Sequence, residues 1–220
     1  MFPIRDSTPR QSFPFVNYAL ILLNVLVFVV ELAAPNFDVF VDRYAFIPAQ
    51  FSFFRIDSYF PIFTALFVHG GFLHIASNMW FLHIFGDNIE DRFGHLLYLF
   101  FYLAAGFIAT MGQYVFTAGS PVPMIGASGA VSGVAGAYYV LFRHSKVETL
   151  VALFLVWTVI ELPASFVLGY WFVTQLFAGL GSLATIDINQ GGIAFFAHIG
   201  GFIFGYLVAK GTRSEGKTAT

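Results

Sequence analysis

Four polar residues in otherwise apolar stretches of the sequence could together perform chemistry. His74 and Asn78 are four residues apart, a spacing that places two side chains on one face of a helix. Ser128 stands in a Gly-Ala-Ser-Gly segment, and His198 lies in a later apolar stretch. A serine hydroxyl becomes a nucleophile when a neutral imidazole removes its proton, and histidine or asparagine side chains can donate hydrogen bonds to the oxyanion that forms. These residue types indicate Ser128 and His198 as a catalytic pair, with His74 and Asn78 as an oxyanion hole.

The composition is that of an integral membrane protein. Only 10% of the 220 residues are charged, against roughly 25% in ordinary soluble domains, while 58% are hydrophobic. Mean hydropathy is +0.79. A soluble enzyme of this length could not bury so much apolar surface, so we expect one domain embedded in the lipid bilayer. The absence of cysteine excludes disulfides and thiolate metal sites, and a net charge of −2 gives no reason to expect nucleic acid as a partner.

Long uncharged stretches predict an all-α fold, a polytopic bundle of six transmembrane helices. About 20 apolar residues cross the roughly 30 Å hydrocarbon core of a bilayer, and turn-forming residues at 117–123 divide the longest stretch. We predict helices over residues 15–34, 71–89, 95–116, 126–142, 148–178 and 192–210. The membrane domain then occupies residues 15–210, between a short cytoplasmic segment, 1–14, and a cytoplasmic tail, 211–220.

Lysine and arginine positions predict that both chain ends lie in the cytoplasm. Cytoplasmic loops of membrane proteins are enriched in these residues, and with the N-terminus inside, eight of the ten fall on that side. The eight are Arg5, Arg10, Arg92, Arg143, Lys146, Lys210, Arg213 and Lys217, and the other two are Arg43 and Arg55. The second, fourth and sixth helices then all enter from the outer face, and each carries its polar residues within roughly 10 Å of that end.

Glycine stripes predict that the fourth and sixth helices touch. Small residues spaced by about one helical turn let two helix backbones approach closely in lipid. Close approach of these two helices would bring His198 within hydrogen-bond reach of Ser128. The glycines in question are Gly129, Gly133, Gly136, Gly201 and Gly205.

Together, these residues resemble the rhomboid family of intramembrane serine proteases over about residues 15–210. The resemblance implies a six-helix bundle, a Ser128–His198 dyad, and an oxyanion site made of His74, Asn78 and the Ser128 backbone N–H. It also implies a single-span membrane protein as substrate, cut after a small residue near the outer boundary of the bilayer. We expect no cofactor and no metal ion. A bacterial inner membrane is the expected location. The segments that carry the resemblance are His69–Asn78, Glu90–Arg92, Gly126–Gly129 and Ala197–Gly201 with Gly205.

Two positions depart from patterns found in some rhomboids. Some members have a tyrosine four residues after the nucleophile, packed on the catalytic histidine, where this chain has Ser132. What orients His198 is therefore open, although Ser132 could offer a weak hydrogen bond. Some members also have Trp-Arg before the second span, where this chain has Phe60-Pro61.

Three segments around the helices carry further expectations. Residues 35–70 mix aromatic with charged side chains, typical of a loop lying in the headgroup layer or folded onto the bundle, and both can hold. The glycine-rich segment 179–192 suits a mobile lid over a water-filled recess. A break between Glu161 and Gly169 could let the fifth helix tilt to admit substrate; a kink with a hydrogen-bonded carboxyl is the simpler alternative.

Several other polar residues have mainly structural interpretations. His69 could assist the site or bond a loop, while His83 and His95 are expected to be structural. Glu90 and Arg92 are most simply an anchor pair at the cytoplasmic surface.

Each candidate catalytic residue also has a noncatalytic interpretation. Ser128 could serve packing alone, His198 could bond a carbonyl oxygen, and His74 with Asn78 could bridge helices. At the level of the whole protein, one alternative is a noncatalytic rhomboid-like protein that binds and escorts membrane clients. The other is a transporter or channel, whose polar groups should be spread through the bilayer depth rather than gathered near one side. The oligomeric state stays open.

Overall fold

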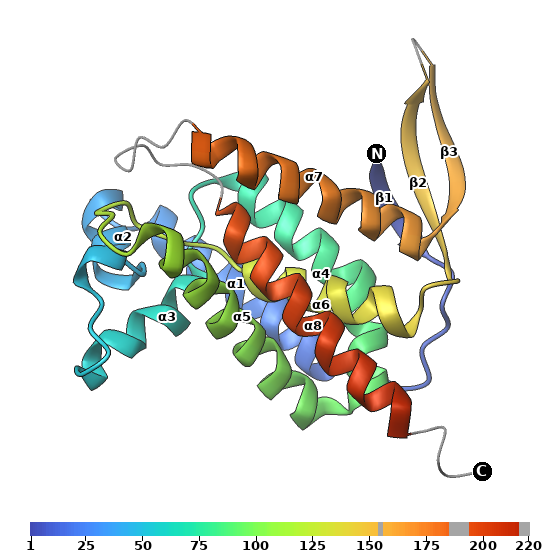
Figure 1. The fold of residues 1–220 in the computed structure, drawn as a ribbon, viewed down its shortest axis with the longest axis horizontal. Coiled ribbons are helices and arrows are strands. Elements are labelled where there is room, and N and C mark those ends of the chain that lie inside the picture. Colours follow the sequence, from blue (N-terminus) through green and yellow to red (C-terminus); the bar gives the residue numbers. More distant parts are fainter. Residues whose placement is uncertain (154–155, 185–193, 216–220) are drawn as a thin grey trace.

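Six helices form the body of the protein in the computed structural model, which describes residues 1–153, 156–184 and 194–215 (Figure 1). Five of them begin and end close to the positions predicted from sequence, and the fifth in order is the exception. The six are α1 (Phe15–Leu32), α4 (Phe72–Phe93), α5 (His95–Thr117), α6 (Ser128–Leu141), α7 (Ala164–Ala184) and α8 (Phe195–Glu215).

Membrane-spanning character is clearest in three of these helices. Among the described residues, α1, α5 and the Ala164–Gly181 part of α7 are each long and apolar enough to cross a membrane. A fourth candidate is α4 taken together with the helical segment Ile56–Phe67, from which it is bent by 86°. The prediction of a polytopic helical protein is therefore supported, with three to four spans identified by length and composition.

Helix α6 lies at the centre of the bundle, behind α8 and between α4 and α5 (Figure 1). Every residue from Gly129 to Tyr138 is buried. Most of these residues are glycine, alanine, serine or valine, so neighbouring helices can come close on several sides.

Helices α6 and α8 touch backbone to backbone. A Cβ added at Gly201 would lie 2.1 Å from the carbonyl oxygen of Gly129, and one added at Gly205 would lie 1.9 Å from that of Gly133. A Cβ at Gly136 would lie 2.1 Å from the carbonyl oxygen of Phe202. No side chain fits at these positions, and the predicted close approach of the two helices is confirmed.

A small antiparallel sheet corrects the expectation of an all-α chain. Strands β1 (Phe2–Asp6), β2 (Lys146–Leu153) and β3 (Val156–Pro163) pair in the order β1-β2-β3. The helix predicted over 148–178 is wrong in its first half, because the chain forms the β2–β3 hairpin there and α7 begins only at Ala164.

Side-chain chemistry explains the hairpin. Val147, Thr149 and Val151 alternate along β2 and are all buried, as expected of a strand with one face against the protein. The β-branched and aromatic residues that favour strands continue through β3. Pro163 then ends the pairing and directly precedes the first turn of α7, where a fixed φ is tolerated.

The gate hypothesis fails in its original form. Glu161 is an exposed residue of β3 and pairs across the hairpin with Glu148, whereas Gly169 lies inside α7. The two residues do not flank a break within one helix, and the alternative of a hydrogen-bonded carboxyl at a kink is also wrong.

The segment after α1 folds onto one end of the bundle, on the left in Figure 1. Phe46, Ile62 and Ala65 form a buried cluster that packs against α5. Phe54 and Ile56 remain 99% and 88% exposed. The structure thus supports a loop folded onto the bundle with an apolar tip facing outward. Its helical elements are α2 (Phe37–Tyr44), α3 (Phe60–Thr64) and the 3₁₀ turns Pro48–Gln50, Ile56–Tyr59 and Ala65–Phe67.

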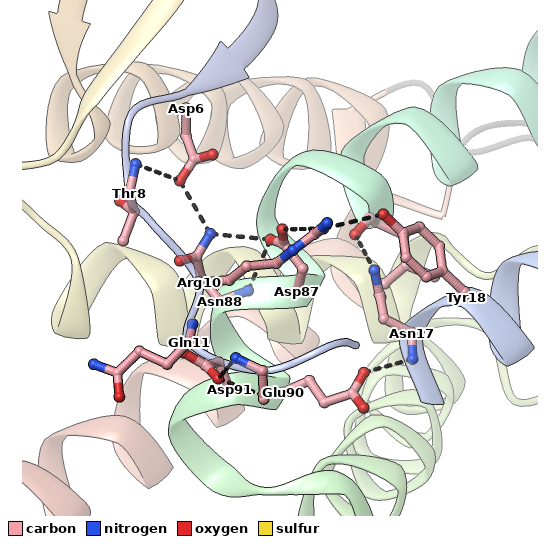
Figure 2. Close-up of polar contacts among 12 residues, drawn as sticks. Asp6, Thr8, Arg10, Gln11, Asn17, Tyr18, Asp87, Asn88, Glu90 and Asp91 are labelled. Carbon is pink, nitrogen blue, oxygen red and sulfur yellow. Dashed lines mark hydrogen bonds and ion pairs between the residues drawn. The ribbon is translucent and has the colours of Figure 1, made fainter. Parts of the chain in front are cut away.

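A buried carboxylate clamps the opposite end of the bundle. Glu90 is fully buried on α4. It accepts hydrogen bonds from the backbone N–H of Val16 at 2.9 Å and from that of Asn17 at 2.6 Å (Figure 2). These N–H groups open α1 and have no partner within their own helix, and the positive end of the helix dipole favours a carboxylate. The expected surface anchor is wrong for Glu90, which is buried against α1. Arg92 is exposed, and its role as a surface anchor stays a prediction.

The N-terminal segment is fastened to the same end of α4. Asp91 accepts a hydrogen bond from the backbone N–H of Gln11 at 2.9 Å (Figure 2) and another from that of Ser12 at 2.9 Å. Asp6 accepts from Asn88 Nδ2 at 3.1 Å and from the hydroxyl of Tyr138, on α6, at 2.5 Å. Residues 1–14 therefore form part of the packed structure.

The α6–α8 contact predicts a steric penalty for the smallest possible side chain. We expect Gly205→Ala to lower the free energy of unfolding by about 1–3 kcal/mol, because its methyl group would overlap the Gly133 carbonyl. Thermal unfolding in detergent micelles measures the effect. Gly211→Ala, on the same helix, is the matched control, since nothing lies within 4 Å of a Cβ there. Equal stability of the two variants would contradict the close contact.

The Glu90 clamp predicts a second stability effect. We expect Glu90→Gln to lower the free energy of unfolding by about 1–3 kcal/mol, since the charged acceptor of two helix N-terminal N–H groups is lost. The same unfolding measurement applies, with the exposed Glu161→Gln as control. A Glu90→Gln protein as stable as that control would show that the carboxylate charge has no role at this helix end.

Candidate active site

Ser128 opens the central helix of the bundle. It is half-buried and is the first residue of α6. The start of this helix has no side-chain cap. Backbone N–H groups at a helix start favour nearby negative charge, so this is a suitable place for an oxyanion to form beside the Ser128 hydroxyl.

His74 and Asn78 lie against the chain just before Ser128. Gly126 has φ +113°, and a Cβ there would lie 2.6 Å from His74 Nε2 and 3.8 Å from Asn78 Nδ2. Glycine is therefore required both by its backbone conformation and by the imidazole that fills the space of a side chain. The two α4 residues and the start of α6 converge, as the sequence predicted.

Asn78 contributes a polar group with no partner in the part of the chain that the structure describes. The residue is 6% exposed, and its Nδ2 atom is buried without a hydrogen bond. Leaving a buried donor unsatisfied costs free energy, and such donors are rare in folded proteins. An unpaired amide donor beside a serine at a helix start fits a group that completes its hydrogen bonds only with a bound substrate.

His198 lies near the start of α8, which α5 holds in place. Gln113, on α5, accepts hydrogen bonds through Oε1 from the backbone N–H groups of Phe196 and Ala197, at 3.0 and 3.2 Å. This side chain caps the N-terminal turn of α8, a role that the sequence analysis did not identify.

Ser128 and His198 come from the stretch where α6 and α8 meet. Gly129 directly follows Ser128, and Ala197 directly precedes His198. A Cβ on Gly129 would lie 3.9 Å from the Cβ of Ala197, so Gly129 and Ala197 face each other. Among the described residues no hydrogen bond joins Ser128 to His198. Catalytic hydrogen bonds often tighten only when substrate is bound, and the assignment of the pair stays a prediction.

The group that bonds His198 is one that the sequence analysis missed. His198 Nδ1 lies 2.7 Å from Oε1 of Gln175, on α7. The expectation that Ser132 could orient His198 is wrong, since its hydroxyl donates instead to the carbonyl oxygen of Ser128 at 2.5 Å. The available signal was a glutamine in a mostly apolar helix, where polar side chains are costly and therefore informative.

His69 lies beside the site and also bonds a loop. Its side chain is fully buried, and its ring centroid lies 5.1 Å from that of His74. Its backbone N–H donates to Oε2 of Glu31 at 2.9 Å. Glu31 is itself 3% exposed near the end of α1, so a buried carboxylate supports the turn before α4.

The expected lid lies only partly within the described residues. Residues 179–184 belong to α7, and the remainder of the 179–192 segment, from 185 on, falls outside the described chain.

Comparison with known proteins gives a consistent family. Residues 57–214 match the family model described as the Rhomboid domain. The rhomboid protease GluP of Bacillus subtilis is 30% identical over 202 residues, and the alignment covers 89% of this chain and 34% of that protein. RHOMBOID-like protein 6, mitochondrial, of Arabidopsis thaliana is 30% identical over 145 residues, covering 66% of this chain and 41% of the relative.

A yeast protein is also similar to most of this chain. Rhomboid protein 1, mitochondrial, of Saccharomyces cerevisiae is 27% identical over 194 residues, covering 86% of this chain and 51% of that protein. This chain therefore spans between about a third and a half of the length of these relatives, and the similarity concerns the part they share with it.

The fit of His74 against Gly126 predicts a sensitive position. We expect Gly126→Ala to slow the reaction of Ser128 with a fluorophosphonate probe by about 100-fold, because the methyl group would displace His74, a predicted oxyanion donor. Labelling rates in detergent measure the effect. Gly119→Ala is the control, since nothing lies within 4 Å of a Cβ there. If Gly126→Ala is labelled at the control rate, His74 does not act as an oxyanion donor.

Proposed function

Because this chain belongs to the rhomboid family, we propose that it is an intramembrane serine endopeptidase. Ser128 acts as the nucleophile and His198 as the general base. His74, Asn78 and the Ser128 backbone N–H form the oxyanion hole. The substrates are single-span membrane proteins, cut near the outer boundary of the bilayer.

One observation carries the proposal. The side chains of His74 and Asn78 meet the chain at Gly126, two residues before Ser128, and the buried Nδ2 of Asn78 has no hydrogen-bond partner among the described residues. Hydrogen-bond donors that converge without an acceptor are what an oxyanion hole requires. If the Ser128 hydroxyl served only in packing, it would not require such donors beside it.

The residues support acyl transfer in two steps. As the Ser128 oxygen attacks the substrate carbonyl carbon, His198 takes the hydroxyl proton, and the carbonyl oxygen becomes an oxyanion held by the three donors. The amide C–N bond then breaks, and the imidazolium returns the proton to the leaving amine. Water, activated by the same imidazole, hydrolyses the acyl-enzyme and restores Ser128.

Helix lengths support a site below the membrane surface. The chain is an integral multi-pass membrane protein. The 14 residues of α6 extend about 21 Å, less than the roughly 30 Å hydrocarbon core. If α6 reaches the inner boundary, Ser128 at its other end lies beneath the outer one. We propose six spans with both chain ends in the cytoplasm of a bacterial cell, from the bias of lysine and arginine.

Active-site labelling and cleavage test the proposal together. We expect the wild type to react with a fluorophosphonate and to cleave a reporter single-span protein in proteoliposomes. Ser128→Ala should lose both activities. His198→Ala should be labelled and should cleave about 10²–10⁴-fold more slowly than wild type, since that is the usual contribution of a general base. Mass spectrometry of the products locates the cut.

A matched hydroxyl variant serves as control. Thr212→Ala, which removes a hydroxyl bonded to its own helix at Ala209, should keep the wild-type rate. A folded wild-type protein that neither labels nor cleaves would instead favour a noncatalytic member that binds and escorts membrane clients.

A further inference from the structure

Helix α7 presents two side chains to His198. Gln175 places Oε1 2.7 Å from His198 Nδ1. Trp171 lies four residues earlier, on the same face of the helix, and its ring centroid is 5.8 Å from that of His198 with the ring planes at 39°. The imidazole is thus held by a polar contact at one nitrogen and by an aromatic surface along the ring.

The contact with Gln175 favours one of the two neutral tautomers of His198. An amide oxygen only accepts hydrogen bonds, so this contact is a hydrogen bond when Nδ1 carries the proton of the neutral ring. The other nitrogen, Nε2, then keeps its lone pair. A general base needs that lone pair directed at the hydroxyl whose proton it removes.

Other side chains near His198 have different partners. Ser132 donates to the Ser128 carbonyl, and Gln113 holds the backbone at the start of α8. In the described part of the chain, no other side chain bonds a ring nitrogen of His198. The orienting role therefore falls to a residue on a helix that carries neither the nucleophile nor the base.

We propose that Gln175 is a positioning residue that fixes the tautomer and ring orientation of His198 for general-base catalysis. The proposal rests on the function proposed above and deepens it. Gln175 does not touch the reacting atoms and acts only through the imidazole. Soluble serine hydrolases orient the catalytic histidine with a carboxylate. Gln175 has the same role in this proposal, with a neutral amide in place of the carboxylate.

Neighbouring contacts support a defined position for Gln175. On the same helix, Phe172 stacks on Phe202 of α8 with ring centroids 4.5 Å apart. Gly179 packs near Phe195 and Ile199, at 3.2 and 3.5 Å from the position of a Cβ. These contacts lie on either side of Gln175 along α7 and hold that helix against the helix that carries His198.

Two measurements on matched variants test the proposal. We expect Gln175→Leu to react with a fluorophosphonate about tenfold more slowly than wild type, the loss expected for one neutral hydrogen bond. The control, Thr174→Ala, removes a hydroxyl that donates to the Trp171 carbonyl and should keep the wild-type rate. Gln175→Glu retains an acceptor at the same reach. It should restore most of the rate at neutral pH and move the acid limb of the pH–rate profile to higher pH, because a carboxylate stabilises the imidazolium.

Histidine ¹⁵N NMR in detergent gives a readout independent of activity. The wild type should show His198 protonated at Nδ1, Gln175→Leu should show a mixture of tautomers, and Thr174→Ala should match wild type. If Gln175→Leu fails to fold, the pH–rate shift in Gln175→Glu decides. The proposal is overturned if Gln175→Leu keeps the wild-type tautomer and reacts at the rate of the control. It is also overturned if the pH–rate profile of Gln175→Glu is unchanged. An unlabelled wild type with the Nδ1–H tautomer would instead refute the proposed function and leave the positioning contact standing.

Discussion

The carbonyl oxygens of Gly129 and Gly133 lie only 2.1 and 1.9 Å from the positions that β-carbons would take on Gly201 and Gly205. This backbone contact fixes the separation of α6 and α8 at its lower limit. Other parts of the site are arranged around it: Ser128 comes one residue before the first contact, and His198 three residues before Gly201. Two helices held by side-chain packing alone would be farther apart.

Long polar side chains complete what the glycines begin. Gln113 holds the start of α8, Glu90 holds the start of α1, and Glu31 holds the turn before α4. Each side chain reaches from one helix to backbone N–H groups of another segment that lack helical partners. In an apolar environment an unsatisfied N–H is costly, so these contacts favour one arrangement of the helices. They also explain why these three polar residues lie near the ends of their helices.

Sequence alone predicted much of this arrangement, and the failures have physical causes. Uncharged stretches located five helices well because lipid constrains segment length. The stretch after Lys146 misled, since a continuous apolar run is compatible with a strand or a helix and its periodicity does not distinguish them. His74, Asn78, Ser128 and His198 stood out by residue type and shared depth, and the first two meet the chain just before Ser128. Gln175 and Gln113 were missed because their importance depends on which helix faces which, and sequence spacing within one helix does not contain that information.

The composition of α6 has a thermodynamic consequence. Folding normally restricts side-chain rotamers, but glycine and alanine have none to lose. Six of the 14 residues of α6 are glycine or alanine, so most of this helix becomes buried with little loss of side-chain entropy. In a bilayer, where helix association gains little from the hydrophobic effect, a small entropic cost allows weak dispersion forces and close dipole contacts to hold the centre of the protein together.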